Sequence, residues 1–219
     1  MSEARERILA DIRAALNRTG PLPESIARSL ESRLARPRPN LLPAIGADRI
    51  AHFIDKLTAV SGKITRVERI EAVAEVVAEH LGRYALGDRL VVAPDAALDA
   101  IPWSNRLGVE RRAAAGDDRL SVTGAYAAVA ETGSVVLLSS PDSPTTLNFL
   151  PDDHVVVVHE SQIVAHIEDV WARMRKDKRA MPRTVNFITG PSKTGDVEQI
   201  IQEGAHGPRR LHVILLDER

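Results

Sequence analysis

Short apolar runs with the composition of buried strands recur through the later part of the chain. They lie at residues 89–93, 134–138, 154–158, 184–188 and 211–216, and each is rich in Val, Ile or Leu. Segments with the spacing of amphipathic helices separate several of these runs. Strands that alternate with helices form a largely parallel sheet, because each connection must cross a face of the sheet before the next strand begins. We therefore predict an α/β protein in which one largely parallel sheet, with helices on both faces, organises the residues after 46.

The first 46 residues have a different character. Residues 3–17 place apolar side chains at helical spacing among Glu and Arg, which predicts an exposed amphipathic helix. From Gly20 to Gly46 the chain contains five prolines, and this density favours an extended arm over packed structure. The predicted organisation is an N-terminal helix and proline-rich arm over residues 1–46, followed by a compact α/β domain over residues 47–219.

Two helices are predicted at the start of the compact domain. Apolar residues from Ile50 to Val60 recur at helical spacing, which indicates one helix that faces the core. Thr65 and Glu68 have the capping-box spacing, in which each side chain accepts an otherwise unpaired backbone N–H, so the next helix is predicted to begin there. Further elements are predicted as a strand near 107–111, a helix over 163–174 and a short helix over 197–201.

The composition narrows the classes of function. The chain has no cysteine, which excludes disulfides, thiolate nucleophiles and cysteine-held iron–sulfur clusters within it. A net charge of −1 and an aromatic share of 3% argue against nucleic-acid binding. The charged N-terminus lacks the apolar core of a secretion signal, and no apolar run is long enough to insert into a membrane, so a cytoplasmic location is expected.

The first candidate site is the turn Glu131-Thr132-Gly133, which leads into an apolar strand. Gly133 permits a sharp turn and a close backbone approach to a ligand, Thr132 supplies a hydroxyl, and Glu131 supplies a carboxylate suited to acid–base catalysis. The alternative is a structural turn whose glutamate is held by backbone amides.

The second candidate site spans Thr189, Gly190, Ser192, Lys193 and Thr194, between a predicted strand and a predicted helix. Free N–H groups and the dipole at a helix N-terminus favour anions, so this segment could hold a carboxylate or phosphate. It does not have the spacing of a P-loop. The alternative is an ordinary helix cap beside a solvated lysine.

A glycine-bounded loop before the last strand contains His206, which is the imidazole best placed for acid–base catalysis. The alternative is a hydrogen-bonded structural histidine. The other histidines are scattered without the spacing of a zinc site, so no metal site is predicted. The serines do not form the nucleophile elbow of a hydrolase.

Two blocks of the sequence resemble the LUD-domain family, in its lactate-utilization protein C type. The first is the AxAETGSVVL core within Val122 to Leu138, and the second is ITGPSKTGDVEQIIQEGAHGPRRLHVILLD from Ile188 to Asp217. With the strand at 154–158, the resemblance covers roughly residues 45 to 217 by the order of elements. The combination of motifs in the second block is more specific than the ETG motif alone.

This resemblance implies a fold similar to the group of sugar isomerases, CoA transferases and formyltetrahydrofolate cyclo-ligases. It also implies a role in oxidising L-lactate to pyruvate together with iron–sulfur lactate-utilization proteins, which would hold the clusters that this chain cannot. In that reading Glu131, Thr132 and Gly133 form one wall of a pocket for a small organic acid. Thr189, Gly190, Ser192, Lys193 and Thr194 form the anion-binding wall, and the loop with His206 closes the same face.

Two main functions remain open at this point. The first is a non-redox subunit of an iron–sulfur L-lactate oxidation system, which binds an organic acid or organises its partner subunits. The second is an autonomous nucleotide- or CoA-dependent enzyme of the cyclo-ligase or transferase kind. A regulatory binding module is a third possibility, and the sequence does not separate the three.

Overall fold

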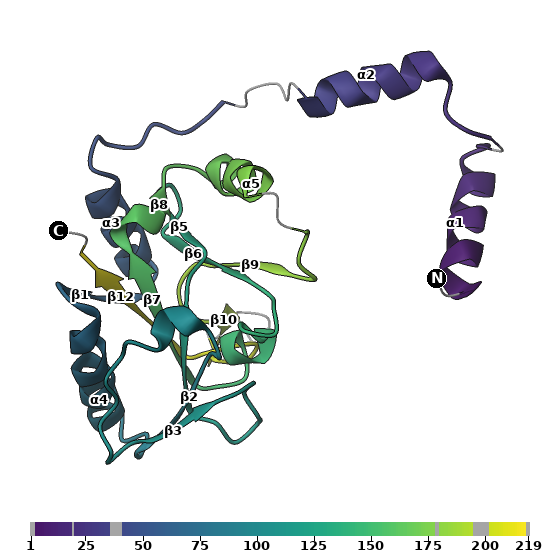
Figure 1. Ribbon diagram of the computed structural model, residues 1–219. Helices are drawn as coiled ribbons and strands as arrows, with labels where there is room; N and C mark the ends of the chain where they lie inside the picture. The colour runs from purple at the N-terminus through teal and green to yellow at the C-terminus, as the bar shows by residue number, and fades with distance from the viewer. Residues whose placement is uncertain (1–2, 19, 36–40, 178–179, 195–201, 218–219) are drawn as a thin grey trace. The chain divides into compact units, whose positions relative to one another are not determined.

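The computed structural model describes residues 3–18, 20–35, 41–177, 180–194 and 202–217. The chain divides into two compact units, residues 1–42 and residues 43–219. The first unit contains helices α1 (Glu3–Ala15) and α2 (Glu24–Ala35), shown in purple and blue in Figure 1. No helix in these described ranges is both long enough and apolar enough to cross a membrane.

Helix α2 corrects the prediction of an extended arm, whereas α1 confirms the predicted N-terminal helix. The carbonyl of Pro23 accepts the backbone N–H groups of Ile26 and Ala27, at 2.9 and 3.0 Å. Proline is tolerated in the first turn of a helix, because its missing N–H would have no partner there in any case. The prolines of this segment lie outside α2, so counting them over the whole segment hid a helix between them.

The second unit is built on a six-stranded sheet in which every neighbouring pair of strands is parallel. Its order is β1-β12-β7-β4-β2-β3. The strands are β1 (Lys63–Val67), β2 (Arg89–Val92), β3 (Gly108–Arg111), β4 (Leu120–Gly124), β7 (Asp153–His159) and β12 (Arg210–Leu216). The predicted α/β class and largely parallel main sheet are therefore confirmed.

A second sheet corrects the prediction that a single sheet organises the domain. It has four strands in the order β8-β5-β6-β9 and is mainly antiparallel, with β10 and β11 forming a separate antiparallel pair. The runs at 134–138 and 184–188 were predicted as strands, but their antiparallel pairing with each other was not, because no local pattern tells which strand will lie beside another. The strand at 127–129 was not predicted, because alanine carries little strand preference. The strands are β5 (Ala127–Val129), β6 (Ser134–Leu138), β8 (Ile163–Val164), β9 (Val185–Ile188), β10 (Lys193–Thr194) and β11 (Gln202–Glu203).

Helices cover both faces of the main sheet, because its strands are apolar on both sides. Helices α3 (Arg49–Ala59) and α4 (Val73–Arg83) lie on opposite sides of β1 and β12 (Figure 1). On β7, Val155 and Val157 belong to the α4 side of the core. Val156 and Val158 belong to the other side, which α3 shares with the second sheet.

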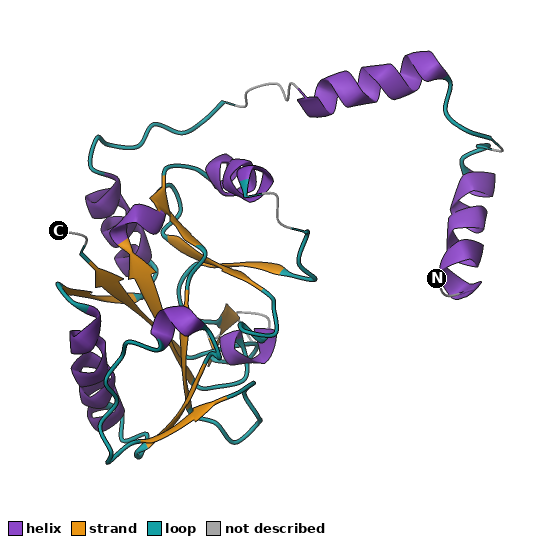
Figure 2. Cartoon of the chain, viewed as in Figure 1, coloured by secondary structure: helices purple, strands orange, loops and turns teal. Residues whose placement is uncertain are grey.

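Helix α5 (Ile167–Lys176) covers the outer face of the second sheet. The second sheet thus lies between the main sheet and α5 (Figure 2). Alternate residues of β5 serve its two faces, since Ala127 and Val129 pack toward α5 while Ala128 packs toward the main sheet. The resulting layers are α4, the main sheet, α3 with the second sheet, and α5.

The capping box predicted at Thr65 and Glu68 is wrong. Strand β1 continues through Val67, which is paired with Leu216 of β12, and α4 begins only at Val73. Pairing with β12 satisfies the backbone N–H groups that a cap would otherwise serve. Among the described residues, four short 3-10 helices connect the larger elements: η1 (Ile70–Ala72), η2 (Ala96–Leu98), η3 (Thr145–Asn148) and η4 (Glu160–Gln162).

The helix predicted over 163–174 begins later than expected, because Ile163 and Val164 form β8 beside β5. The helix predicted over residues 197–201 lies outside the described residues.

A buried polar chain lies where β7 and β12 begin. The Asp153 carboxylate accepts hydrogen bonds from His80 Nε2 at 3.0 Å and Arg210 Nη2 at 2.7 Å. Nδ1 of His80 lies 3.1 Å from Nδ1 of His212, and His212 Nε2 lies 2.8 Å from the Thr65 hydroxyl. Burial alone would raise the pKa of Asp153, but the hydrogen bonds from His80 and Arg210 outweigh it and hold that pKa below its ordinary value. The chain ties α4 and β1 to the start of the two central strands.

Candidate functional site

Both candidate segments lie against the last turns of α3. Gly133 and Gly190 have φ angles of +70° and +81°, which glycine adopts readily and other residues rarely do. A Cβ atom at Gly133 would lie 2.4 Å from the backbone nitrogen of Leu57, and one at Gly190 would lie 2.9 Å from the carbonyl oxygen of Val60. The close approach expected for Gly133 is therefore made to α3, and the two glycines let the two segments meet at one helix end.

A chain of hydroxyl groups joins the two segments. The Thr132 hydroxyl lies 2.6 Å from that of Ser134, which is also hydrogen-bonded to the hydroxyl of Thr189. Ser134 is buried, whereas Thr189 is exposed. The structure thus brings together Thr132 and Thr189 from the two predicted segments, and adds Ser134 as the group between them. Sequence analysis missed Ser134, although its place directly after Gly133 on the apolar strand was a usable signal.

Glu131 pairs with His166, which sequence analysis did not select. The Glu131 carboxylate lies 3.0 Å from His166 Nδ1, and the two side chains are only 19% and 13% exposed. Both backbones are held, since the N–H of Glu131 donates to the Ala165 carbonyl at 3.0 Å and that of His166 to the Asp169 carboxylate at 2.9 Å. A carboxylate that is held in place by an imidazole is an arrangement suited to proton transfer.

Lys193 and Thr194 form strand β10, an element that was not predicted at this position. The Ser192 backbone N–H donates to the Pro208 carbonyl at 2.8 Å. The ammonium group of Lys193 donates to the Ser61 hydroxyl at 2.8 Å. The remainder of the predicted helix start, residues 195–201, lies outside the described residues.

His206 lies beside the second segment and is not paired with Glu131. Its backbone N–H donates to the Ser192 hydroxyl at 3.3 Å, and its side chain is exposed. A Cβ atom at Gly207 would lie 3.5 Å from Cβ of Ser192, so this loop packs closely on that segment. The final loop therefore packs against Ser192.

The segment around Ser192 lies near the edge where strands of the main sheet begin. Val60 and Pro208 contact it, and they shortly precede β1 and β12. Ligands of open α/β sheets usually gather at the opposite, carboxyl edge. What this site offers is hydroxyl groups, one ammonium group and a carboxylate–imidazole pair. Across the described ranges, no three His, Cys, Asp or Glu residues are grouped so that they could hold a metal ion.

Residues 50–216 match the family model of the LUD domain. A protein named lactate utilization protein C from Anoxybacillus flavithermus is 33% identical over 121 residues, which cover 55% of this chain and 54% of that protein. A protein of the same name from a Geobacillus species (strain WCH70) is 29% identical over 171 residues, 71% of each chain. In the first three such relatives the matched part spans about half of the relative's length, between 50% and 54%.

A crystal structure of a DUF162 family protein from Deinococcus radiodurans has a similar fold. It superposes with a TM-score of 0.59 at 24% identity, covering 80% of this chain and 99% of that one. This similarity agrees with the fold described above, and the family model spans nearly all of the sheets and helices of the second unit. The chain therefore belongs to the LUD domain family.

Proposed function

We propose that this chain acts in lactate utilization as a non-redox subunit that works beside iron–sulfur proteins in the cytoplasm. Its own task would be to bind a small organic acid or to organise the partner subunits. The observation that carries the proposal is the match to a lactate utilization protein C over 71% of both chains. The domain boundary near residue 46 belongs to the same proposal, with the preceding segment as the arm that docks partners.

The absence of cysteine supports a system in which partner proteins accept the electrons and this chain does not. Oxidation of lactate to pyruvate releases two electrons and two protons, and cysteine-held clusters that could accept the electrons require thiolates. This chain has none. Its contribution would then be restricted to binding, orientation and proton transfer, with clusters in the partner proteins.

The geometry near α3 suits a hydroxy acid or oxo acid. Lys193 provides a positive charge, and the Thr132 and Thr189 hydroxyls provide groups that donate or accept hydrogen bonds. Glu131, oriented by His166, is the group assigned to proton transfer. Gly133, Gly190, Ser192, Thr194 and His206 surround these groups in this proposal.

Deletion of the gene in its native host tests the role. We expect loss of growth on L-lactate with unchanged growth on glucose, and restoration by the wild-type chain. Complementation with Glu131→Gln should fail at equal protein abundance, because the amide cannot take up the proton. Asp55→Asn, which neutralises an exposed carboxylate on α3, is the matched control and should restore growth.

Affinity purification of the tagged chain from lactate-grown cells tests the partners. We expect iron-containing proteins to co-elute, measured by metal analysis of the eluate and identification of its proteins. Normal growth of the deletion strain on lactate, together with an eluate free of iron, would contradict the proposal.

The pair of Glu131 and His166 also favours a second candidate, an autonomous nucleotide- or CoA-dependent enzyme. Such an enzyme would turn over a CoA thioester or nucleotide without partner proteins. Turnover by the purified chain that is lost in Glu131→Gln would support this alternative over the subunit role. Growth of the deletion strain on lactate would be compatible with it.

A further inference from the structure

A cavity of about 710 Å³ lies at the other end of β6 from Ser134. Its walls come from the residues that follow β2 and β4, the end of β6, the last turn of α5 and residues 180–183. The volume is within the range of about 300–1,000 Å³ that is typical of ligand sites. A three-carbon acid would leave most of this space empty, so the cavity suits a larger molecule than lactate.

The cavity lies at a topological switch point of the main sheet. Strands β2 and β4 are neighbours. The chain passes from β2 to β3 on one side, whereas from β4 it passes through β5 and β6 of the second sheet to β7, which lies on the other side. Asp95 and Ala97 from the first connection and Gly124 to Tyr126 from the second line the cavity. Connections that diverge at the carboxyl ends of adjacent parallel strands leave a crevice in which open α/β sheets bind their ligands.

Two guanidinium groups make the cavity rich in hydrogen-bond donors. Arg173 lies over the ring of Tyr126 at 5.1 Å, and Arg183 lines the same space. Within the described ranges neither guanidinium forms a salt bridge with a carboxylate. The Asp177 carboxylate instead accepts the Tyr126 hydroxyl at 2.8 Å. A guanidinium group can bind a phosphate or a carboxylate through two parallel hydrogen bonds, and its plane can also stack on an aromatic ring.

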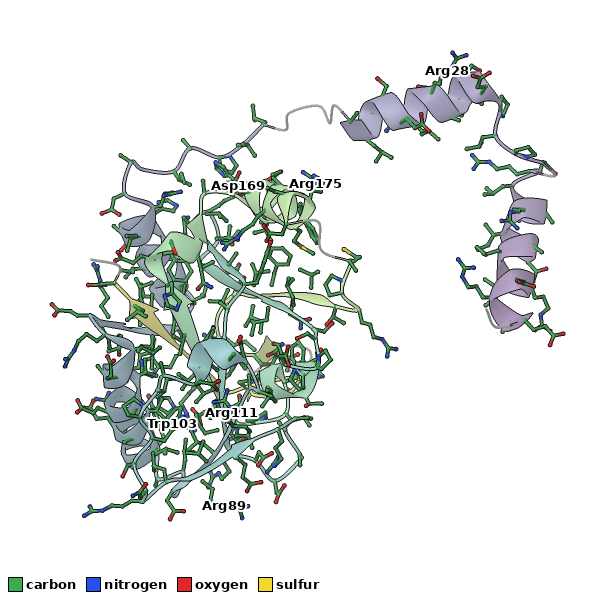
Figure 3. All side chains as sticks on the ribbon, viewed as in Figure 1. Arg28, Arg89, Trp103, Arg111, Asp169 and Arg175 are labelled. Atoms are coloured by element: carbon green, nitrogen blue, oxygen red, sulfur yellow. The ribbon has the colours of Figure 1, made fainter. Side chains whose placement is uncertain are left out.

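Asp95 supplies an acceptor at the carboxyl end of β2. One carboxylate oxygen accepts the Ala97 N–H at 2.9 Å. The second carboxylate oxygen of Asp95 would lie 3.3 Å from a Cβ atom at position 124. Because Gly124 has no Cβ, this oxygen is not covered from the side of β4. Arg111, labelled in Figure 3, holds the loop by donating to the Asp95 carbonyl at 2.6 Å. An acidic side chain held beyond a parallel strand is suited to accept the hydroxyls of a sugar ring.

We propose that this crevice is a second binding site, for a nucleoside phosphate. The phosphate contacts Arg173 and Arg183, the sugar hydroxyls donate to Asp95, and the base lies against the apolar wall that Leu138 contributes. The site is separate from the Glu131 pair and does not depend on a role in lactate utilization.

Isothermal titration calorimetry of the full-length chain with ADP tests this proposal. We expect measurable binding of ADP and much weaker binding of adenosine, which lacks the anion. Arg173→Gln and Arg183→Gln should each weaken ADP binding by about tenfold or more, because each removes charge-assisted hydrogen bonds. Arg175→Gln is the matched control, since Arg175, labelled on α5 in Figure 3, is exposed and does not line the cavity.

The titrations distinguish a nucleotide site in this cavity from the absence of one. Loss of affinity in both cavity variants with wild-type affinity in Arg175→Gln supports the site. Equal affinity in all variants, or no binding of ADP at millimolar concentration, overturns it. Because Arg183 is exposed, its variant should unfold at the wild-type midpoint, which separates lost binding from lost folding. Backbone amide exchange provides a second measurement, since ADP should slow exchange at residues 124–126 and leave residues 131–134 unchanged.

Discussion

At the scale of single residues, Gly133 carries the strictest steric requirement. Its φ is +70°, and an added Cβ would lie 2.4 Å from the backbone nitrogen of Leu57. We expect Gly133→Ala to lower the free energy of unfolding by about 2–4 kcal/mol, because both backbone strain and overpacking oppose it. Urea denaturation measures this change as a lower urea concentration at the midpoint of unfolding, with an unchanged dependence of the free energy on urea concentration.

The control for that substitution is Gly82→Ala in α4, where no atom beyond the adjacent backbone of the helix lies within 4 Å of the added Cβ. This substitution should raise stability by up to about 1 kcal/mol, because alanine favours helix more than glycine does. Similar midpoints for the two variants would contradict the packing of the Glu131 turn on α3.

At the scale of elements, α3 depends on its N-cap. The Asp48 carboxylate accepts the backbone N–H groups of Ile50 and Ala51, both at 3.0 Å. We expect Asp48→Ala to reduce the free energy of unfolding by about 1 kcal/mol and Asp48→Asn to change it little, because asparagine caps a helix equally well. Thermal or urea unfolding of the two variants checks this. An equal loss in both would show that the charge of Asp48, and not its cap geometry, matters.

At the scale of the whole molecule, buried histidines make stability depend on pH. Burial lowers the pKa of His154 to about 3, and burial together with the nearby charge of Lys63 lowers that of His212 to about 3. Because the unfolded chain binds these protons near pH 6.5, the unfolded state gains protons first as the pH falls. Stability should therefore be level above about pH 7 and fall between about pH 6.5 and pH 3, by about 1.4 kcal/mol per pH unit for each histidine.

Urea unfolding at pH 7, 6, 5 and 4 measures this slope. His154→Leu removes one titrating group from the core. The free energy of unfolding of this variant should therefore fall less steeply with decreasing pH than that of the wild type, by the equivalent of about one proton. Parallel pH profiles for the two proteins would contradict the assignment of His154 as a buried neutral imidazole. The Asp153 carboxylate acts in the same direction at lower pH, since its lowered pKa gives stability that is lost as the carboxyl protonates.

Elements with strong local patterns were predictable from the sequence. The apolar runs at 89–93 and 211–216 became β2 and β12, and the helical spacing from Ile50 to Val60 became α3. Their hydrophobic periodicity lies within one stretch of chain, so no partner is needed to recognise it. Family membership was readable for the same reason, because the motifs of the second block are contiguous.

The candidate site was predictable only in part. Thr132 and Thr189 were selected and do share one hydroxyl chain, but Ser134 between them and His166 beside Glu131 were not selected. Glu131 and His166 are 35 residues apart. No pattern along the chain links a turn residue to a helix cap at that separation, so the pair depends on how β5 lies beside β8.

The sequence by itself determined the alternation of strands and helices, the absence of thiol chemistry and the family. Tertiary structure decided that β1 runs through Val67, that a second sheet covers α3's side of the main sheet, and that Gly133 and Gly190 serve contacts with α3. The physical reason is that a backbone N–H bonds to the acceptor next to it in space, and an apolar surface packs on the neighbour next to it in space, wherever these lie in the sequence. Local propensity describes one segment, whereas the choice between strand, cap and turn at Thr65 was made by β12, a strand from the other end of the chain.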